Sequence, residues 1–426
     1  MSEAQQTIST SPATWSGTVS DAEQPKPPYK VGMALALVTF LWLGPYLGVN
    51  AVLLPAKVAT IAPNSKATII AVLSTSAMVV ATLANIVFGA LSDLTRTKWG
   101  RRTPWIIAGS IACCIMLFVI SSVTTVGPLI VTWCVYQLFL NAIVAPSIAV
   151  LADRTAPKNR GKITSIYALG YSVGLYGGQT IGAQFLNNVT AGFAVMAVFT
   201  LIAGPVGAVM MKEQSSLGMP KGHFDVHMLL AHFSFPMHKC RDYYLALFGK
   251  FLIISANFAI SGYQLYILTD YMKQSSGKTA EFVSIISLSL MVTALIMSAC
   301  AGPISDRIGR RKLPVIVASV FIAAGVFIPF LSPQPWTMIV YGIVAGIGMG
   351  SYNAVDQALN IEVLPDPNTA AKDLGILNLA NTGGQVLGPV LAATLISAFG
   401  YQAIFPMATV CALCGAVLVS MIRSVK

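Results

Sequence analysis

The sequence predicts an all-α membrane protein with twelve transmembrane helices in two pseudo-symmetric six-helix bundles. Of its 426 residues, 55% are hydrophobic and only 10% are charged, whereas a soluble domain carries roughly a quarter charged residues. The apolar residues gather in runs of about 20 or more, the length that a helix needs to cross a bilayer. Two motifs also recur at matching places in the two halves of the chain. Composition, run length and repeat together predict this fold.

Twelve apolar runs are bounded by Pro, Gly or charged residues, and each is long enough to span a lipid bilayer. They cover residues 31-55, 67-91, 104-124, 128-151, 163-186, 190-211, 243-270, 281-304, 313-332, 336-361, 374-398 and 402-422. We therefore predict a disordered cytoplasmic tail at 1-30, an N-terminal six-helix bundle at 31-211, a cytoplasmic linker at 212-242 and a C-terminal six-helix bundle at 243-426. The tail is rich in Ser, Thr and Pro and lacks the apolar core of a signal peptide.

The basic residues indicate the orientation. With both termini in the cytoplasm, one span contains Lys250, and only four of the 26 lysines and arginines face outside, namely Lys57, Lys66, Lys273 and Lys278. Cytoplasmic loops carry an excess of Lys and Arg, so we expect a multi-pass protein of the plasma (inner) membrane with both termini inside. Because the net charge of +11 lies in these loops, we expect no nucleic-acid partner.

The histidines indicate no catalytic or metal site. All four lie in the predicted linker, at His223, His227, His232 and His238. The first two could form a metal pair at i, i+4 spacing, but a solvated amphipathic segment on the membrane surface is the favoured interpretation. No H-E-x-x-H motif or membrane-embedded Ser/His pair is present. We therefore expect neither an enzyme nor a bound cofactor or metal.

An internal repeat relates the two halves. Gly89-Ala-Leu-Ser92-Asp93 followed by Gly100-Arg101-Arg102 matches Gly302-Pro-Ile-Ser305-Asp306 followed by Gly309-Arg310-Arg311. The fifth and eleventh spans share a second motif, Gly177-Gly178-Gln179-Thr-Ile-Gly182 and Gly383-Gly384-Gln385-Val-Leu-Gly388. Parallel six-helix repeats are typical of rocker-type transporters, whose substrate site lies between the halves near the membrane midplane.

At these residues the sequence resembles the major facilitator superfamily from about residue 31 to 422. The segment GALSDLTRTKWGRRTPWI at 89-106 is similar to the glycoside-pentoside-hexuronide:cation symporters and the related sucrose-transporter-like group. In the melibiose-permease branch of that group, paired aspartates of the second span bind the coupling sodium. The corresponding positions here are Ala81 and Asn85, so the main anionic ligands are missing and sodium coupling of that type is not expected.

The repeated cytoplasmic motif resembles the gating motif of the superfamily. We expect Asp93 and Asp306 to face the positive N-terminus of a helix in the other half. The arginines can reach carboxylates at the ends of the fourth and tenth spans, and the resulting contacts would break as the inner side opens. The alternative is that these charges are exposed topology signals worth under about 1 kcal/mol each. The expected gating residues are Asp93, Arg101, Arg102, Asp153, Asp306, Arg310, Arg311 and Glu362.

Asp356 is the leading candidate for a proton-coupling site, because ionisable residues inside spans are costly and usually functional. It shares one helix face with Asn353, Gln357 and Asn360, at i, i+3, i+4 and i+7 spacing. A structural role is the alternative, in which Asp356 bonds to an amide across the bundle and never titrates. Lys250 could pair with a carboxylate, but we expect its ammonium to reach the cytoplasmic interface instead.

The remaining polar residues of the spans are amides and aromatics. Such side chains suit hydrogen bonding to hydroxyls and stacking against the C-H face of a sugar, although helix-to-helix bonding is their commoner role. We expect three partners: a small polar uncharged solute of the sugar type, a coupling proton and the lipid bilayer. The candidates for substrate binding are Tyr46, Asn50, Trp133, Gln137, Asn141, Gln179, Asn257, Tyr263, Gln264, Tyr266, Tyr352, Asn353, Gln357, Asn378, Asn381 and Gln385.

The sequence thus predicts a secondary transporter that works by alternating access and couples sugar or glycoside uptake to protons. A proton-antiporting exporter of drugs or metabolites is one alternative, because Gly174, Gly177, Gly178 and Gly182 loosely resemble a glycine-rich antiporter signature. A transport-inactive membrane sensor is another alternative. The two intact gating motifs argue against it.

Overall fold

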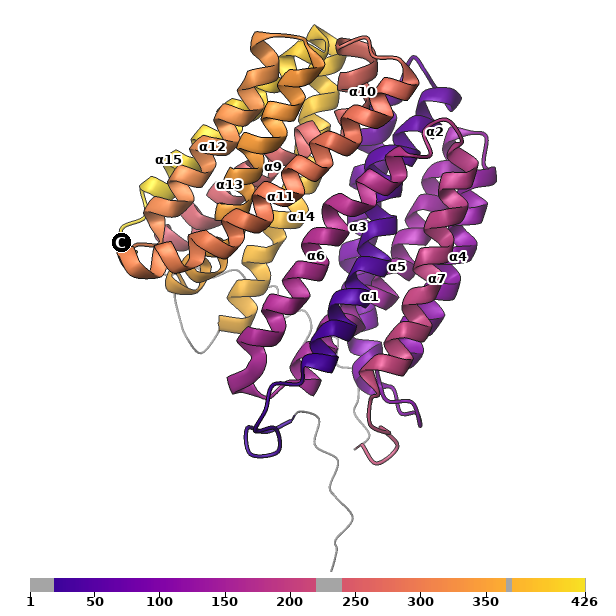
Figure 1. The fold of residues 1–426 in the computed structure, drawn as a ribbon, viewed down its shortest axis with the longest axis vertical. Helices are drawn as coiled ribbons and strands as arrows, with labels where there is room; N and C mark the ends of the chain where they lie inside the picture. The colour runs from indigo at the N-terminus through magenta and orange to yellow at the C-terminus, as the bar shows by residue number, and fades with distance from the viewer. Residues whose placement is uncertain (1–18, 220–239, 365–369, 426) are drawn as a thin grey trace, which may run out of the picture.

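The computed structural model describes residues 19–219, 240–364 and 370–425, and every regular element in these ranges is helical. The predicted all-α membrane fold is confirmed. Most of the predicted linker lies outside the described residues, as do the four histidines. Figure 1 shows two helical bundles side by side, one formed by α1 to α7 and the other by α9 to α15.

The N-terminal bundle begins with a long first span. Helix α1 (Tyr29–Gly48) continues through a π-helical turn (Val49–Leu53) into α2 (Leu54–Ile61), so this span extends beyond the predicted residue 55. The other helices of this bundle are α3 (Lys66–Leu94), α4 (Thr103–Ser122), α5 (Val126–Arg154), α6 (Arg160–Ala183) and α7 (Val189–Met211).

The C-terminal bundle repeats this plan with one interruption. Helix α9 (Arg241–Ser261) ends early, and the short α10 (Gln264–Tyr266) leads into a π-helical turn (Ile267–Tyr271) within the predicted span 243-270. The remaining helices are α11 (Ser276–Ile308), α12 (Lys312–Leu331), α13 (Pro335–Glu362), α14 (Ala370–Phe399) and α15 (Ile404–Ser420).

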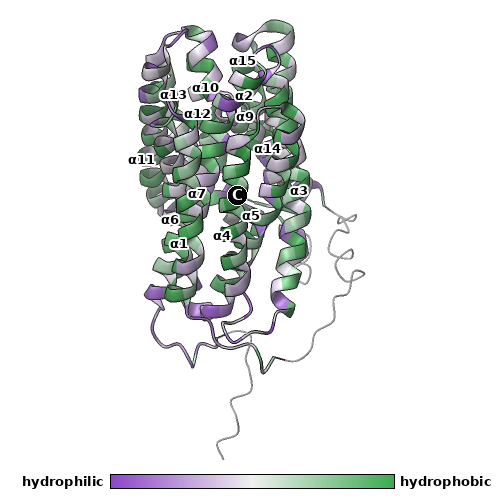
Figure 2. Cartoon of the chain, turned by 90° about the vertical axis from the view of Figure 1, so that its right-hand side faces the viewer, coloured by the Kyte–Doolittle hydropathy of each residue, from purple (hydrophilic) through white to green (hydrophobic). Residues whose placement is uncertain are grey.

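Among the described residues, 11 helical segments are long and apolar enough to cross a membrane. The predicted span at 163-186 corresponds to α6, which is not one of them. Its many Gly, Ser, Tyr and Gln residues lower its hydropathy. Helix α6 packs against α1 and α11, and its buried residues include Gly170, Gly174, Gly178 and Gly182. In Figure 2 the helices are largely hydrophobic, and hydrophilic residues gather in the loops at the lower end.

The end of the predicted tail, residues 19–28, lies against the N-terminal bundle. Residues 19–28 contact the loop between α5 and α6, where the Gln24 side chain donates to the Arg154 carbonyl (3.1 Å) and accepts from the Ala156 amide (2.8 Å). Asp21 accepts from the Lys158 amide (3.0 Å). Polar side chains at the end of the predicted tail thus find backbone partners in a loop far away in the sequence.

The repeated glycines let paired helices approach closely. Glycines of α6 face the backbone of α1, and a Cβ added at Gly178 would lie 2.0 Å from the Gly44 carbonyl oxygen. In the second half, a Cβ at Gly388 of α14 would lie 2.4 Å from the Ser255 carbonyl oxygen of α9. The shared motif therefore marks the same close helix packing in each bundle.

This packing predicts that alanine substitutions at two neighbouring glycines affect protein stability differently. Gly178→Ala should lower the free energy of unfolding by at least about 2 kcal/mol, since overpacking forces the helices apart. Gly177→Ala is the control, because the added Cβ would meet only Val173, at 3.7 Å. Both substitutions gain the same intrinsic helix propensity. Thermal unfolding in detergent measures both variants. Equal midpoints for the two would contradict this role of Gly178.

Candidate functional site

The two bundles meet along two helix pairs. Helix α6 packs against α11, and α3 packs against α14. Helices α4, α7, α12 and α15 pack within their own bundles. Among the other long helices, α1 and α5 share an aromatic stack, and α9 and α13 share a buried ion pair. These four helices hold the candidate site.

An ion pair crosses the interior of the C-terminal bundle. Lys250 of α9 places its Nζ atom 2.7 Å from Oδ2 of Asp356 of α13, and the two residues are only 3% and 6% exposed. The Asn360 side-chain amide donates to the same oxygen (2.9 Å), and Tyr352 is buried beside this carboxylate one turn earlier. Asp356 is thus buried and held by a cation from another helix.

This pairing corrects the prediction that Lys250 reaches the cytoplasmic interface. The residue lies nine positions after Arg241, the start of α9, or roughly 13 Å along the helix. That depth exceeds the reach of a lysine side chain to the helix end, whereas the carboxylate of Asp356 is close by. The expected setting of Asp356 among neutral amides was likewise incomplete, because its nearest partner is charged.

An aromatic stack joins α1 and α5 in the N-terminal bundle. Tyr46 stacks on Trp133 with ring centroids 6.2 Å apart, and Trp133 stacks on Tyr136 at 5.1 Å. The Tyr46 hydroxyl also bonds to the Gln137 side chain. Trp133 and Tyr136 are fully buried, yet the indole Nε1 and the Tyr136 hydroxyl have no partner among the described residues. Two hydrogen-bond donors are therefore available here.

Amide side chains lie beside this aromatic stack. The Asn85 side chain of α3 donates to Asn141 Oδ1 (3.1 Å), and the Asn141 amide donates to the Gln137 carbonyl (2.9 Å). Tyr136 was missed by the sequence analysis because it lies beside predicted Gln137 and looks like an ordinary core aromatic. Gln179 instead donates to the Leu175 carbonyl of its own helix (3.1 Å). Asn50 and Asn257 are half-buried in α1's π-helical extension and in α9.

Several predicted binding residues lie elsewhere. The Tyr263 hydroxyl donates to the carbonyls of Ala67 and Pro389, and Tyr266 donates to Pro55. These tyrosines join the two halves at one end, so their expected role in substrate binding does not fit this arrangement. Gln264, between them, is 3% exposed and its two amide atoms have no partner among the described residues.

The contacts of Tyr263 and Tyr266 belong to a clamp, which we define as these two residues with Lys66, Asp270 and Tyr401. Lys66 of α3 pairs with Asp270 at 2.5 Å and lies 4.8 Å from the ring centre of Tyr266. Tyr401 donates to the same carboxylate (2.8 Å). At the same end, Gln184 at the end of α6 donates to Ser284 of α11 (2.8 Å). These contacts close one end of the seam, at the top of Figure 1.

Toward the opposite end, polar side chains of the spans are exposed. Asn353 of α13 and Asn378 of α14 are exposed, and Asn381 donates to Asn378 (2.7 Å). Gln385 of α14 is half-buried, and the side chain of Gln357 lies outside the described residues. Because amides are not stable against lipid hydrocarbon, these exposed amides indicate a water-accessible passage. The seam between the bundles is thus held together at the clamp, whereas these amides lie exposed toward the other end.

The gating motif of the N-terminal half forms a charge network. Arg101 contacts Asp153 at 2.6 Å, and Arg102 contacts both Asp153 (3.0 Å) and Asp93. Asp93 therefore pairs within its own half, and no contact of it with a helix of the other half is found among the described residues. Glu213 was missed by the sequence analysis, yet its carboxylate accepts from the amides of Arg102 and Thr103 at the start of α4. An acid facing a helix N-terminus is a known stabilising arrangement.

The second copy of the motif is looser. Arg311 contacts Glu362 at 3.4 Å, with side chains 26% and 45% exposed. Arg311 also donates to Ser305 (3.1 Å), whereas Arg310 is exposed. The side chain of Asp306 lies outside the described residues. Arg311 thus contacts a carboxylate at the end of the tenth span, as Arg102 contacts Asp153 at the end of the fourth. The contact of Arg311 is longer and more exposed than that of Arg102.

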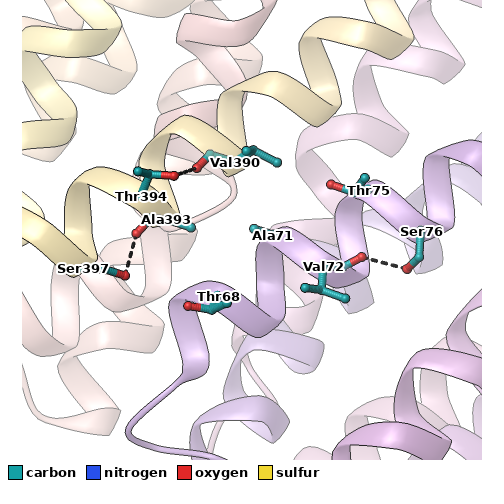
Figure 3. A pocket seen from close by; sticks show the side chains of 9 residues that line it. All are labelled: Thr68, Ala71, Val72, Thr75, Ser76, Val390, Ala393, Thr394 and Ser397. Carbon is teal, nitrogen blue, oxygen red and sulfur yellow. Dashed lines mark hydrogen bonds between the residues drawn. The ribbon is translucent and has the colours of Figure 1, made fainter.

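A shallow hollow of about 500 Å³ lies in the seam between α3 and α14 (Figure 3). The hydroxyls of Ser76, Thr394 and Ser397 donate to carbonyls of their own helices, so the hollow is largely apolar. None of the predicted site residues lines it. It is distinct from the polar set on α1, α5, α9 and α13.

Comparison with known proteins identifies the family. The Major Facilitator Superfamily model matches residues 31–226 and 246–426, nearly all of the helical part. The chain belongs to the major facilitator superfamily. It is therefore a membrane transporter of small solutes and not an enzyme. The structure is also similar to the nucleoside transporter NupG (D323A mutant), with a TM-score of 0.73, 14% identity and coverage of 92% of this chain and 99% of that one.

Curated superfamily members resemble parts of the chain. The bacillibactin exporter of Bacillus subtilis is 34% identical over 30% of this chain and 33% of its own. The multidrug resistance protein MdtG of Dickeya zeae is 25% identical over 61% and 63%, and the D-xylose transporter of Levilactobacillus brevis is 32% identical over 29% and 26%. The matches thus span less than two thirds of each relative, and these relatives include both exporters and a sugar transporter. None of these three is named as a glycoside-pentoside-hexuronide symporter.

Proposed function

We propose that this superfamily member couples the uptake of a sugar or glycoside to protons, with Asp356 as the proton site. The observation that carries this proposal is the buried Lys250–Asp356 pair inside the spans. An intramembrane carboxylate is costly and usually functional, and this one bridges two helices of the bundle. The Tyr46–Trp133–Tyr136 stack and its amide neighbours provide the flat faces and hydrogen-bonding groups that suit a sugar.

Protons are preferred over sodium because the second span has no carboxylate at positions 81 and 85. At the positions expected for a sodium site, Ala81 has no oxygen side chain and Asn85 is bonded to Asn141. A sodium ion needs several oxygen ligands, preferably with negative charge. The similarity of the D-xylose transporter and of the Arabidopsis thaliana inositol transporter 4 (31% identical over 30% of this chain) supports a polyhydroxylated solute.

A proton-antiporting exporter is the second candidate. It is favoured by the similarity to the bacillibactin exporter and to MdtG. The glycine-rich motif of α6 no longer favours it, because Gly178 and Gly182 are explained by close packing against α1 in either direction of transport.

Reconstitution in proteoliposomes tests the proposed function. With an acidic exterior, radiolabelled sugars such as D-xylose should accumulate inside above their external concentration. A protonophore should abolish that accumulation and leave counterflow intact, because exchange needs no net proton movement. Sugar exchange with no response to the pH gradient would reject proton coupling. Solute loss driven by external acid would support the exporter instead.

The proposed orientation has a separate test. Ser275, before α11, and Ser215, after α7, are both exposed. In a background without reactive cysteines, Ser275→Cys in intact cells should react with an impermeant maleimide, whereas Ser215→Cys should react only after permeabilisation. Both side chains are exposed, so a difference in labelling reports the side of the membrane on which each residue lies. The reverse pattern would invert the topology.

A further inference from the structure

The hollow between α3 and α14 lies within the membrane-spanning helices and faces outward. Val72, one of its lining residues, is 42% exposed, and it continues a row of exposed apolar side chains along α3 at Val79, Leu83 and Val87. Residues at these spacings lie on one face of a helix. Because α3 is long and apolar enough to cross a bilayer, this face contacts lipid and the hollow opens toward hydrocarbon.

Both helices present the hollow at the same depth. Its lining residues lie two to ten positions after Lys66, where α3 begins, and two to nine positions before Phe399, where α14 ends. Both helix ends are on the clamp side, because Lys66 and Tyr401 contact the same carboxylate. At 1.5 Å per residue the hollow extends from roughly 3 to 15 Å below these ends. That depth corresponds to one leaflet of a hydrocarbon core about 30 Å thick.

A tyrosine joins the two walls of the hollow on the inner side. The Tyr263 hydroxyl donates to the carbonyls of Ala67 and Pro389, which directly precede the lining residues Thr68 and Val390. Tyr263 is only 1% exposed, so this tie lies inside the protein. The hollow is therefore a groove in the lipid-facing surface, separated by Tyr263 from the interior of the two bundles.

The lining of the groove suits a hydrocarbon chain. The hydroxyls of Ser76, Thr394 and Ser397 donate to carbonyls of their own helices, so they require no partner from an occupant. A polar solute would need free donors and acceptors. Small side chains such as Ala71 and Ala393 leave a volume of about 500 Å³ (Figure 3). An unfilled volume of this size would cost its lining atoms their dispersion contacts.

We propose that this groove binds one acyl chain of a bilayer lipid and that the bound chain stabilises the closed clamp. The chain contacts α3 of one bundle and α14 of the other at the same time. When the bundles separate at this end, the clamp contacts break and the two walls of the groove move apart together. The lipid thus binds the clamped form more tightly and shifts the population toward it. The inference is independent of the proposed function, because this lipid is not the transported solute.

A matched pair of tryptophan substitutions tests the site. Thr394→Trp fills the groove from an exposed position, so the interior of the protein is left alone. Val131→Trp is the control, because Val131 is 62% exposed and does not line the hollow. Val131 lies five residues after the start of α5, and Thr394 lies five residues before the end of α14. The two tryptophans therefore lie at a matched depth from their helix ends.

Native mass spectrometry of the detergent-purified proteins, incubated with dioleoyl-phosphatidylcholine, counts the bound lipids. Wild type and Val131→Trp should each retain one more lipid than Thr394→Trp. Equal lipid counts for the three proteins would overturn the site. A wild-type dimer that Thr394→Trp loses would identify a second copy of the chain as the occupant, and would likewise overturn the lipid.

Spin labels measure the effect of the lipid on the clamp and do not depend on the folding of a groove variant. In an otherwise wild-type background without reactive cysteines, Asn64→Cys before α3 and Gln402→Cys after α14 place one label on each bundle at exposed positions. Added dioleoyl-phosphatidylcholine should increase the population with the shorter separation between the labels. The same labels in Thr394→Trp should show no such response. A distribution of separations that the lipid leaves unchanged in the wild-type background would overturn stabilisation of the clamp.

Discussion

Asp356→Asn should abolish uphill uptake driven by a pH gradient while exchange of labelled for unlabelled solute persists. Asparagine cannot accept and release a proton, so the variant stays in a form that resembles the protonated state. Exchange requires only movement of the loaded transporter, and the loaded form has no need to deprotonate. Both fluxes are measured on the same proteoliposomes, so loss of folding would lower them together.

The control for this variant is Glu281→Gln, which removes a carboxylate of α11 that is exposed and far along the chain from the ion pair. Its pH-driven uptake should match that of the wild type. The substitution removes the partner of Lys250 under either interpretation, so the two roles differ in the pattern of fluxes: a purely structural role predicts that pH-driven uptake and exchange fall together. Full retention of pH-driven uptake by Asp356→Asn would reject it as the proton site.

Asp153→Asn should slow turnover by about 100-fold, which corresponds to about 2.7 kcal/mol. Asp153 is 13% exposed and accepts from two arginines, of which Arg102 is only 4% exposed. Removal of the less exposed carboxylate from such a network costs several kcal/mol, because Arg102 then keeps only the more exposed Asp93 as its anionic partner. If the network stabilises one conformation of the cycle, this cost changes the rate of interconversion.

The internal repeat provides the matched control. Glu362→Gln alters the equivalent contact with Arg311, which is longer and more exposed, so its effect should be less than about 1 kcal/mol. Solute counterflow gives the turnover of each variant, and a binding measurement in detergent shows whether the solute site is intact. Equal turnover of Asp153→Asn and wild type would reduce the motif to a topology signal.

The expected partners of the gating arginines illustrate what the repeat can predict. Arg101 and Arg102 reach Asp153, and Arg311 reaches Glu362, as the helix-end positions indicated. Two features of these contacts were not predictable. Asp93 pairs within its own bundle, and Glu213 binds the start of α4 from a position 110 residues away in the sequence. Both depend on how loops fold back on the helices.

The sequence alone determines the helical spans, their repeat and the family, because apolar length, glycine spacing and charge position are local properties of the chain. Only the tertiary structure decided which polar groups meet. Lys250 and Asp356 are 106 residues apart, and Lys66 meets Asp270 across two bundles. Neither pairing follows from helix periodicity, because it depends on the rotation and depth of separate helices. A buried charge is stable only when packing supplies a partner, and that packing is set by the whole fold.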